Sequence, residues 1–235
     1  MPTLDDLLGK LWDDYATLNP QAKRVHDLLK ARGEMIVNDH IALRTFDDPR
    51  VNIDRLAAAF ERFGYERKDE YVFEQKKLFA RHFEHPEAGR PRVFISELQL
   101  AKCSDGLRDT VARLIDQMPG DLMNRWDSPV AGRPWPVSFA EYEQLAAESE
   151  YAGWMAAHGF RANHFTVLVN ALESFDSLEA LNAFLKENGF ALNTSGGEIK
   201  GSPDDYLEQS STLADEAVVE FTDGPHRVPA CYYEF

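Results

Sequence analysis

An ordered set of short motifs occurs twice along the chain, and this internal repeat restricts the fold more than any other feature of the sequence. The matching pairs are Asp39-His40 and Asn163-His164, Phe63-Gly64-Tyr65 and Asn188-Gly189-Phe190, Phe73-Glu74-Gln75 and Leu207-Glu208-Gln209, and Ser96-Glu97 and Tyr233-Glu234. Apolar strands and helix-ending glycines also match by chance, but four features in the same order at similar spacing favour a true repeat. Each copy has the pattern of a strand, a helix and several further strands, which predicts two βαβββ modules.

The patterns outside the two copies are helical. Apolar residues recur at helical spacing between Thr3 and Arg32, with a break near Asn19-Pro20, which predicts two N-terminal helices. Helical patterns from Leu107 to Met118 and from Phe139 to His158 flank a loop rich in Pro, Gly and Trp. We therefore expect one α+β domain over residues 1–235. Its parts are N-terminal helices (1–35), a first module (36–104), a helical insertion (105–160) and a second module (161–235), with the two modules curving their sheet around a central cup.

Composition limits the partners of this chain. Its 40 acidic and 25 basic residues give a net charge of −15, and no cluster of Lys and Arg offers the positive surface that phosphates require. We therefore expect neither nucleic acid nor a membrane as a partner. The acidic N-terminal stretch lacks the features of a signal peptide, and no apolar run approaches the roughly 20 residues of a membrane span. These features predict a soluble cytoplasmic protein, and nothing in the sequence indicates a particular oligomeric state.

The repeat brings metal-binding side chains to equivalent positions. His40 and His164 each follow Asp or Asn and open an apolar strand, whereas Glu97 and Glu234 end the last strands of the two copies. Because pseudo-twofold symmetry makes equivalent residues converge, these side chains would meet in the cup. Imidazole and carboxylate suit Fe, Mn, Ni or Zn. A lone strand histidine is more often structural, but the matched pair and a carboxylate among aromatic residues favour a metal site.

Arg44 is the candidate for binding an anionic ligand. Side chains alternate on a strand, so Arg44 faces the same side as His40, and its guanidinium there could bind a carboxylate with two parallel hydrogen bonds. A salt bridge to one of the acidic residues is the alternative. Gln209 begins a polar patch that faces either the cup or the outer sheet surface. His82 and His85 are expected in a solvated strand end that leads to a turn.

Five segments together resemble a known family. They are Asn38-Asp39-His40-Ile41-Ala42-Leu43-Arg44-Thr45-Phe46, Glu148-Ser149-Glu150-Tyr151-Ala152, Gly159-Phe160-Arg161-Ala162-Asn163-His164-Phe165-Thr166, Gln209-Ser210-Ser211-Thr212 and Cys231-Tyr232-Tyr233-Glu234-Phe235. In combination, over nearly the whole chain, they resemble the 2-oxoadipate dioxygenase/decarboxylase family, whose fold is similar to that of vicinal-oxygen-chelate enzymes. The resemblance implies an Fe(II) enzyme that converts 2-oxoadipate and O2 to 2-hydroxyglutarate and CO2 in lysine breakdown. A purified sample could carry Zn, Ni or Mn in place of iron.

Carried over by motif, the resemblance implies metal ligation by His40, His164 and Glu234, and substrate binding by Arg44. Glu97 occupies the fourth symmetric position, which glyoxalase-like relatives use as a ligand and the resembled family does not, so whether Glu97 is a fourth ligand stays open. Three protein ligands leave room for a 2-oxo acid and O2, whereas four favour isomerase chemistry. The rival functions are a glyoxalase-like metal-dependent isomerase or lyase, and a non-catalytic binding protein of the same fold. Many members are longer, so the wall that reads the remote carboxylate of the substrate is expected to be reduced here.

Overall fold

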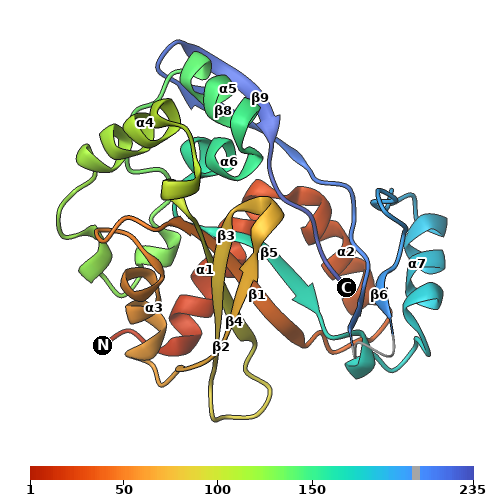
Figure 1. Ribbon diagram of the computed structural model, residues 1–235. Helices are drawn as coiled ribbons and strands as arrows, with labels where there is room; N and C mark the ends of the chain where they lie inside the picture. The colour runs from red at the N-terminus through yellow and green to blue at the C-terminus, as the bar shows by residue number, and fades with distance from the viewer. Residues whose placement is uncertain (203–206) are drawn as a thin grey trace.

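A five-stranded sheet lies at the centre of the molecule, with helices around it (Figure 1). The computed structural model describes residues 1–202 and 207–235. The helices are α1 (Leu4–Leu18), α2 (Pro20–Ala31), α3 (Ile53–Glu61), α4 (Asp105–Asp116), α5 (Phe139–Glu148), α6 (Glu150–His158) and α7 (Leu178–Glu187). The strands are β1 (Asn38–Phe46), β2 (Glu66–Phe73), β3 (Leu78–Glu84), β4 (Arg92–Leu98), β5 (Ala162–Val167), β6 (Lys200–Ser202), β7 (Leu207–Gln209), β8 (Glu216–Phe221) and β9 (Gly224–Pro229). This is the α+β architecture predicted from the sequence.

The strand order of the central sheet is β2-β3-β4-β1-β5. Strand β1 pairs in parallel with β4 and antiparallel with β5, so the first strands of the two halves lie side by side. In that pairing His40 lies opposite Thr166, and Ala42 lies opposite His164. The register therefore brings the two predicted ligand histidines onto adjacent strands.

Helices α1 and α3 cover the face of the sheet opposite the predicted site. On β5, Phe165 packs against Trp12 and Tyr15 of α1, with ring centroids 5.3 Å and 5.0 Å apart. Helix α3 packs on β1 and β4. Because side chains alternate along a strand, burying Phe165 under α1 directs His164 and Thr166 to the other face. Packing of the core thus determines which side chains line the cup.

The second half departs from a simple copy of the first. Of the strands described in this half, β5 alone joins the central sheet, while β6 pairs with β7 and β8 pairs with β9. Glu234 returns to the sheet through isolated bridges to Thr166 and Ser211. Residues 203–206, inside the predicted second module, lie outside the described residues. The expected module boundaries therefore stay a prediction.

The predicted helices outside the modules are present, with one difference. The single pattern from Phe139 to His158 forms two helices, because Ser149 ends α5 and its side chain caps α6 by accepting from the amide of Ala152. Figure 1 shows α4, α5 and α6 gathered at one end of the sheet. Within the described part of the chain, no helix has both the length and the apolar character needed to cross a membrane.

Candidate metal centre

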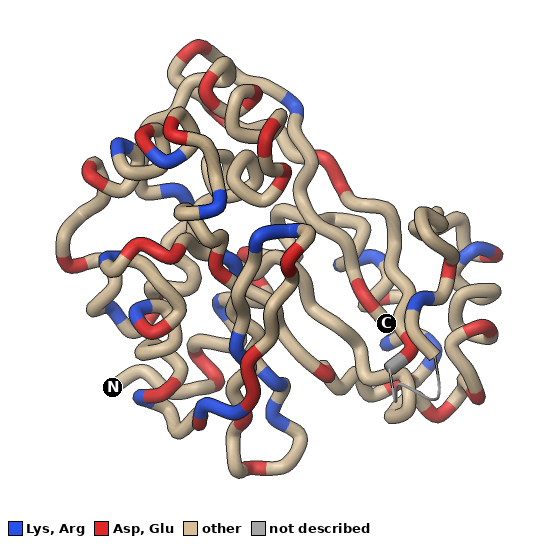
Figure 2. The backbone as a smooth tube through the Cα atoms, in the orientation of Figure 1, with Lys and Arg blue, Asp and Glu red and all other residues tan. Residues whose placement is uncertain are grey.

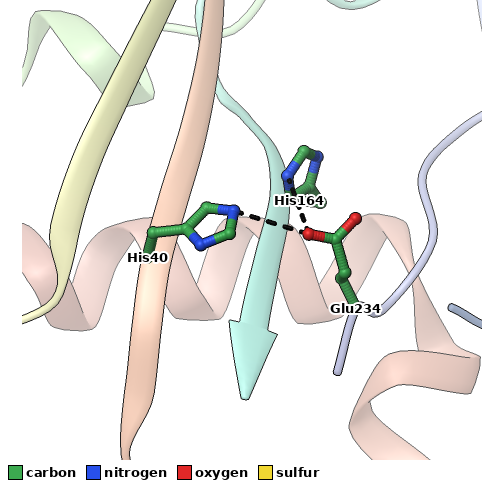
Figure 3. A group of neighbouring side chains, drawn as sticks. All are labelled: His40, His164 and Glu234. Carbon is green, nitrogen blue, oxygen red and sulfur yellow. Dashed lines mark ion pairs between the residues drawn. The ribbon is translucent and has the colours of Figure 1, made fainter. Parts of the chain in front are cut away.

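Three predicted ligands converge at the seam between β1 and β5. His40 comes from β1, His164 from β5 and Glu234 from the C-terminal segment, and one donor atom from each lies within 4.8 Å of the others (Figure 3). Glu234 Oε1 is 3.5 Å from His40 Nε2 and 3.8 Å from His164 Nε2. Among the described residues, no second group of His, Cys, Asp and Glu side chains gathers in this way. Two imidazoles and one carboxylate form the donor set of many divalent transition-metal sites.

The residue before each histidine fixes the orientation of its ring. Asp39 Oδ2 lies 2.8 Å from His40 Nδ1, and Asn163 Oδ1 lies 3.0 Å from His164 Nδ1. Because both partners are oxygens that accept, each Nδ1 carries a hydrogen, which leaves the Nε2 atoms for the centre. The Asp/Asn-His motif of the repeat thus orients each imidazole, as second-shell partners do in metal sites. The residues present fit a metal ion.

The charges of the three donors depend on one another. Burial lowers the pKa of His164 to about 4, so this ring is neutral at pH 7. Burial also acts to lower the pKa of His40, but hydrogen bonds to Asp39 and Glu234 raise it to about 8. Burial would raise the pKa of Glu234, yet the two histidines and Thr166 bring that pKa below its ordinary value. A cation among these donors would replace the proton on His40.

Two neighbouring polar side chains also reach the centre. The Thr166 hydroxyl lies 3.0 Å from both His40 Nε2 and Glu234 Oε1. Gln209, predicted to face either the cup or the sheet surface, lies at the cup, with its Nε2 3.4 Å from Glu234 Oε2. Sequence reasoning missed Thr166, although its position two residues after His164 on a strand places it on the same face.

A cavity opens from the three donors toward the β2–β3 turn. One lobe, of about 290 Å³, is lined by the three donors, and a second, of about 390 Å³, is lined by Arg44. The two lobes adjoin, because seven residues line both: Ala42, Leu43, Lys76, Leu78, Ser96, His164 and Tyr232. We call the combined space the cup. Its size is that of a site for a small molecule.

Tyr232 forms one wall of the cup beside the donors. Its ring stacks on that of His164, with centroids 5.0 Å apart and planes inclined by 23°. Its backbone carbonyl accepts a hydrogen bond from the Tyr15 hydroxyl at 2.5 Å, which ties the C-terminal segment to α1. The prediction from the sequence did not include Tyr232. A stacked ring at this position limits how His164 can turn.

Arg44 lies in the second lobe, over two aromatic rings. Its guanidinium carbon lies 4.8 Å from the Tyr151 ring centroid and 5.1 Å from that of Trp154. The nearest carboxylate oxygen belongs to Glu150, at 3.9 Å on a side chain that is 90% exposed. Arg44 Nη1 is buried and has no hydrogen-bond partner among the described residues. A buried charged donor without an acceptor is costly unless a ligand supplies one.

Glu97, which the sequence left open as a fourth ligand, lies outside this cluster in the structure. In the parallel pairing of β1 with β4, Arg44 lies beside Ser96 and Thr45 beside Glu97. Ser96 lines the cup, so Glu97 points to the opposite face, where its Oε2 accepts a hydrogen bond from the amide of Ile53 at 3.0 Å. In the first half, the residue of β4 that faces the cup is thus Ser96, one position before the Glu97 that the repeat matched with Glu234.

His82 is also placed differently from the prediction. It is buried, with 6% exposure, rather than solvated at a strand end. Its Nδ1 lies 3.0 Å from the Tyr71 hydroxyl, and its ring stacks on Phe94 at 5.1 Å. His85 lies against the carbonyl of Phe63 at 3.0 Å. Neither side chain belongs to the metal-binding group.

Comparison with known proteins identifies similar sequences. The family model described as 2-oxoadipate dioxygenase/decarboxylase matches residues 1–124 and 125–235. A chloroplastic 2-oxoadipate dioxygenase/decarboxylase of Arabidopsis thaliana is 38% identical over 97% of this chain and 66% of its own length. The chain thus spans slightly less than two thirds of that relative.

Solved structures agree with the fold. A "putative hydrolase" from Shewanella frigidimarina NCIMB 400 is 50% identical with a TM-score of 0.95, covering 98% of this chain and 91% of its own. The hydroxyglutarate synthase of Oryza sativa, solved in complex with 2-oxoadipate, is 34% identical with a TM-score of 0.90 over 97% of this chain and 78% of its own. A "putative glyoxalase superfamily protein" from Ralstonia eutropha JMP134, at 22% identity and a TM-score of 0.80 over 98% and 81%, shows the fold alone.

Proposed function

The chain belongs to the 2-oxoadipate dioxygenase/decarboxylase family, and from this membership we propose that it is an Fe(II)-dependent dioxygenase that decarboxylates a 2-oxo dicarboxylic acid. The proposed reaction is 2-oxoadipate and O2 to 2-hydroxyglutarate and CO2, a step of lysine breakdown in the cytoplasm. The rice relative, 34% identical, was solved with 2-oxoadipate bound. The partners proposed for this chain are therefore a small 2-oxo acid and O2.

One observation carries the proposal: a group of three metal-type donors shares a cup with a guanidinium whose buried Nη1 has no hydrogen-bond partner among the described residues. His40, His164 and Glu234 supply the donors, and Arg44 supplies the cation. A 2-oxo acid suits both parts of this site: its carboxylate can bind the guanidinium, and its neighbouring oxygens can bind the metal. A chain with net charge −15 needs such a local cation to attract an anion.

Each residue of the cup has a role in this proposal. His40, His164 and Glu234 would hold the metal, and Fe(II), when bound, supplies the redox chemistry with O2. Arg44, in contact with the rings of Tyr151 and Trp154, orients the substrate through its carboxylate. Apolar side chains of the shared wall, including Leu43 and Leu78, limit water around the reacting end.

The test is O2 consumption by the Fe(II)-reconstituted protein over a panel of 2-oxo acids. We expect O2 uptake with 2-oxoadipate and formation of equal amounts of CO2 and 2-hydroxyglutarate. His40→Ala should abolish uptake and metal retention, whereas His226→Ala, at a histidine stacked on Phe139 outside the cup, should keep both. Undiminished turnover by His40→Ala would refute the assignment.

The rival functions differ in measurable ways. A glyoxalase-like isomerase or lyase would convert its substrate without consuming O2 and would use a fourth carboxylate, but Glu97 is engaged with Ile53 on the other face. A non-catalytic binding protein would bind the 2-oxo acid without any turnover. Metal analysis of the purified protein, which could carry Zn, Ni or Mn, combined with the O2 assay separates the three.

A further inference from the structure

A dicarboxylic 2-oxo acid has a second carboxylate, and the part of the cup that would receive it is formed by the turn between β2 and β3. This turn, Glu74–Lys76 followed by Lys77, connects the paired residues Phe73 and Leu78. Lys77 ends the turn in the left-handed backbone conformation, with φ of 57°, and its amide donates a hydrogen bond to the carbonyl of Glu74 at 3.1 Å. Figure 2 shows basic residues at this turn, close to the centre of the molecule. The turn has a defined shape, so its side chains leave the backbone at defined positions.

The charges of the turn are paired except for one. Glu74 binds Lys102, with Nζ and Oε2 2.8 Å apart, and Lys77 Nζ lies 3.8 Å from Oε1 of Glu148. No ion pair or hydrogen bond joins Lys76 to another side chain in the described residues 1–202 and 207–235. Lys76 is exposed, and it lines both the lobe that contains the three donors and the lobe that contains Arg44. It is therefore a free cation at the mouth of the cup.

The two cations of the cup differ in depth. The Arg44 side chain is 17% exposed, lies over the rings of Tyr151 and Trp154, and lines the same lobe as His164, so we assign it to the reacting end. Lys76, in contrast, is exposed and belongs to the β2–β3 turn. A substrate whose 2-oxo group faces His40, His164 and Glu234, and whose methylene chain follows the wall that the two lobes share, reaches Lys76, which lines both lobes.

We propose that Lys76 binds the remote carboxylate of the substrate and thereby selects dicarboxylic over monocarboxylic 2-oxo acids. This inference rests on the proposed function, because it assigns the substrate class of the same cup. An ammonium on a flexible stem suits this task, since it can follow the end of an extended chain, whereas the fixed guanidinium of Arg44 suits a carboxylate held in one position. Lys76 is a specificity residue in this scheme.

The experiment compares two ligands of equal length, 2-oxoadipate and 2-oxohexanoate, which differ only in the remote carboxylate. Binding to the Fe(II)-loaded protein is measured by calorimetry without O2, so that no turnover occurs. For Lys76→Met we expect about tenfold weaker binding of 2-oxoadipate, the loss of one charge-assisted contact, and less than twofold change for 2-oxohexanoate. Lys76→Arg should restore the preference, and Lys76→Glu should weaken 2-oxoadipate binding further.

Lys68→Met is the matched control. Lys68 is also a lysine of the β2–β3 hairpin, but its Nζ binds Glu66 at 2.9 Å and it lines neither lobe of the cup. This variant should keep wild-type affinity for both ligands. Equal weakening of both ligands by Lys76→Met, or no weakening of either, would overturn the inference.

The outcomes also separate the inference from the proposed function. If the wild-type protein prefers 2-oxoadipate and Lys76→Met loses that preference while no O2 is consumed in air, Lys76 reads the remote carboxylate but the dioxygenase assignment is wrong. If O2 is consumed with 2-oxoadipate and the wild-type protein binds the two ligands equally, the dioxygenase assignment stands and the inference on Lys76 fails.

Discussion

Replacing Arg44 by Met should separate ligand binding from folding. In the proposed complex the guanidinium gives a substrate carboxylate two charge-assisted hydrogen bonds, each worth about 1.5 kcal/mol net. Losing both costs about 3 kcal/mol, which corresponds to about 100-fold in kcat/KM for 2-oxoadipate at tenfold per 1.4 kcal/mol. Arg44→Lys keeps the positive charge but loses the pair of parallel donors of the guanidinium, so its kcat/KM should lie between those of wild type and Arg44→Met.

The stability of the same variant should change little. Arg44→Met removes two ring contacts, worth about 0.5–1 kcal/mol each, but it also removes the buried Nη1 that lacks a partner, a cost of about 1–3 kcal/mol in the folded state. These effects nearly cancel, so urea unfolding should give a free energy within about 1 kcal/mol of wild type. Arg67→Met, at an exposed arginine paired with Glu70 on β2, is the control for both assays. A loss of 3 kcal/mol or more in stability with normal kcat/KM would refute the reasoning, because Arg44 would then be a structural residue.

Three further substitutions test the surroundings of the cup. Asp39→Ala removes the acceptor of His40 Nδ1 and should lower metal affinity by about 10–100-fold in a competitive metal titration; an unchanged affinity would mean that Asp39 does not orient the ring. Glu97→Gln should leave metal stoichiometry unchanged, because its carboxylate binds the amide of Ile53, and any loss of bound metal would contradict its exclusion. Burial lowers the pKa of His158 from 6.5 to about 4. As pH falls, His158 is therefore protonated in the unfolded chain at a higher pH than in the folded protein, which favours unfolding. The contribution of neutral His158 to the free energy of unfolding is complete above pH 6.5 and is lost as pH falls toward 4. Urea unfolding should show a loss of about 2 kcal/mol between pH 6.5 and 5 from this group, and His158→Gln should reduce that slope.

The sequence was sufficient for the parts of the site that follow from strand alternation and from the repeat. The pattern Asp/Asn-His at the start of an apolar run predicted two strands with equivalent histidines, and the structure has them on β1 and β5. The period of two along a strand predicted that Arg44 shares a face with His40, and both line the cup. These relations are local, so tertiary packing did not need to be known.

Relations between strands were not predictable in the same way. Whether Ser96 or Glu97 faces the cup depends on the register of β4 beside β1, and a shift of one residue exchanges the two faces. The polar residues around His82 suggested solvent, but a hydrogen bond from Tyr71 and stacking on Phe94 compensate its burial. The sequence also did not indicate that Lys76 lines the cup, because a lysine in a turn is ordinarily a solvated residue.

The residue of β4 that faces the cup beside Arg44 is Ser96. Its hydroxyl lies 3.0 Å from the hydroxyl of Tyr151, whose ring contacts the Arg44 guanidinium. Ser96→Glu should therefore place a carboxylate next to Arg44: O2 uptake with 2-oxoadipate should fall, because this carboxylate competes with the substrate carboxylate for the guanidinium, while metal binding should stay unchanged. Ser96→Gln, of the same size without the charge, is the matched control for steric effects. Undiminished O2 uptake by Ser96→Glu would show that Arg44 does not bind the substrate carboxylate.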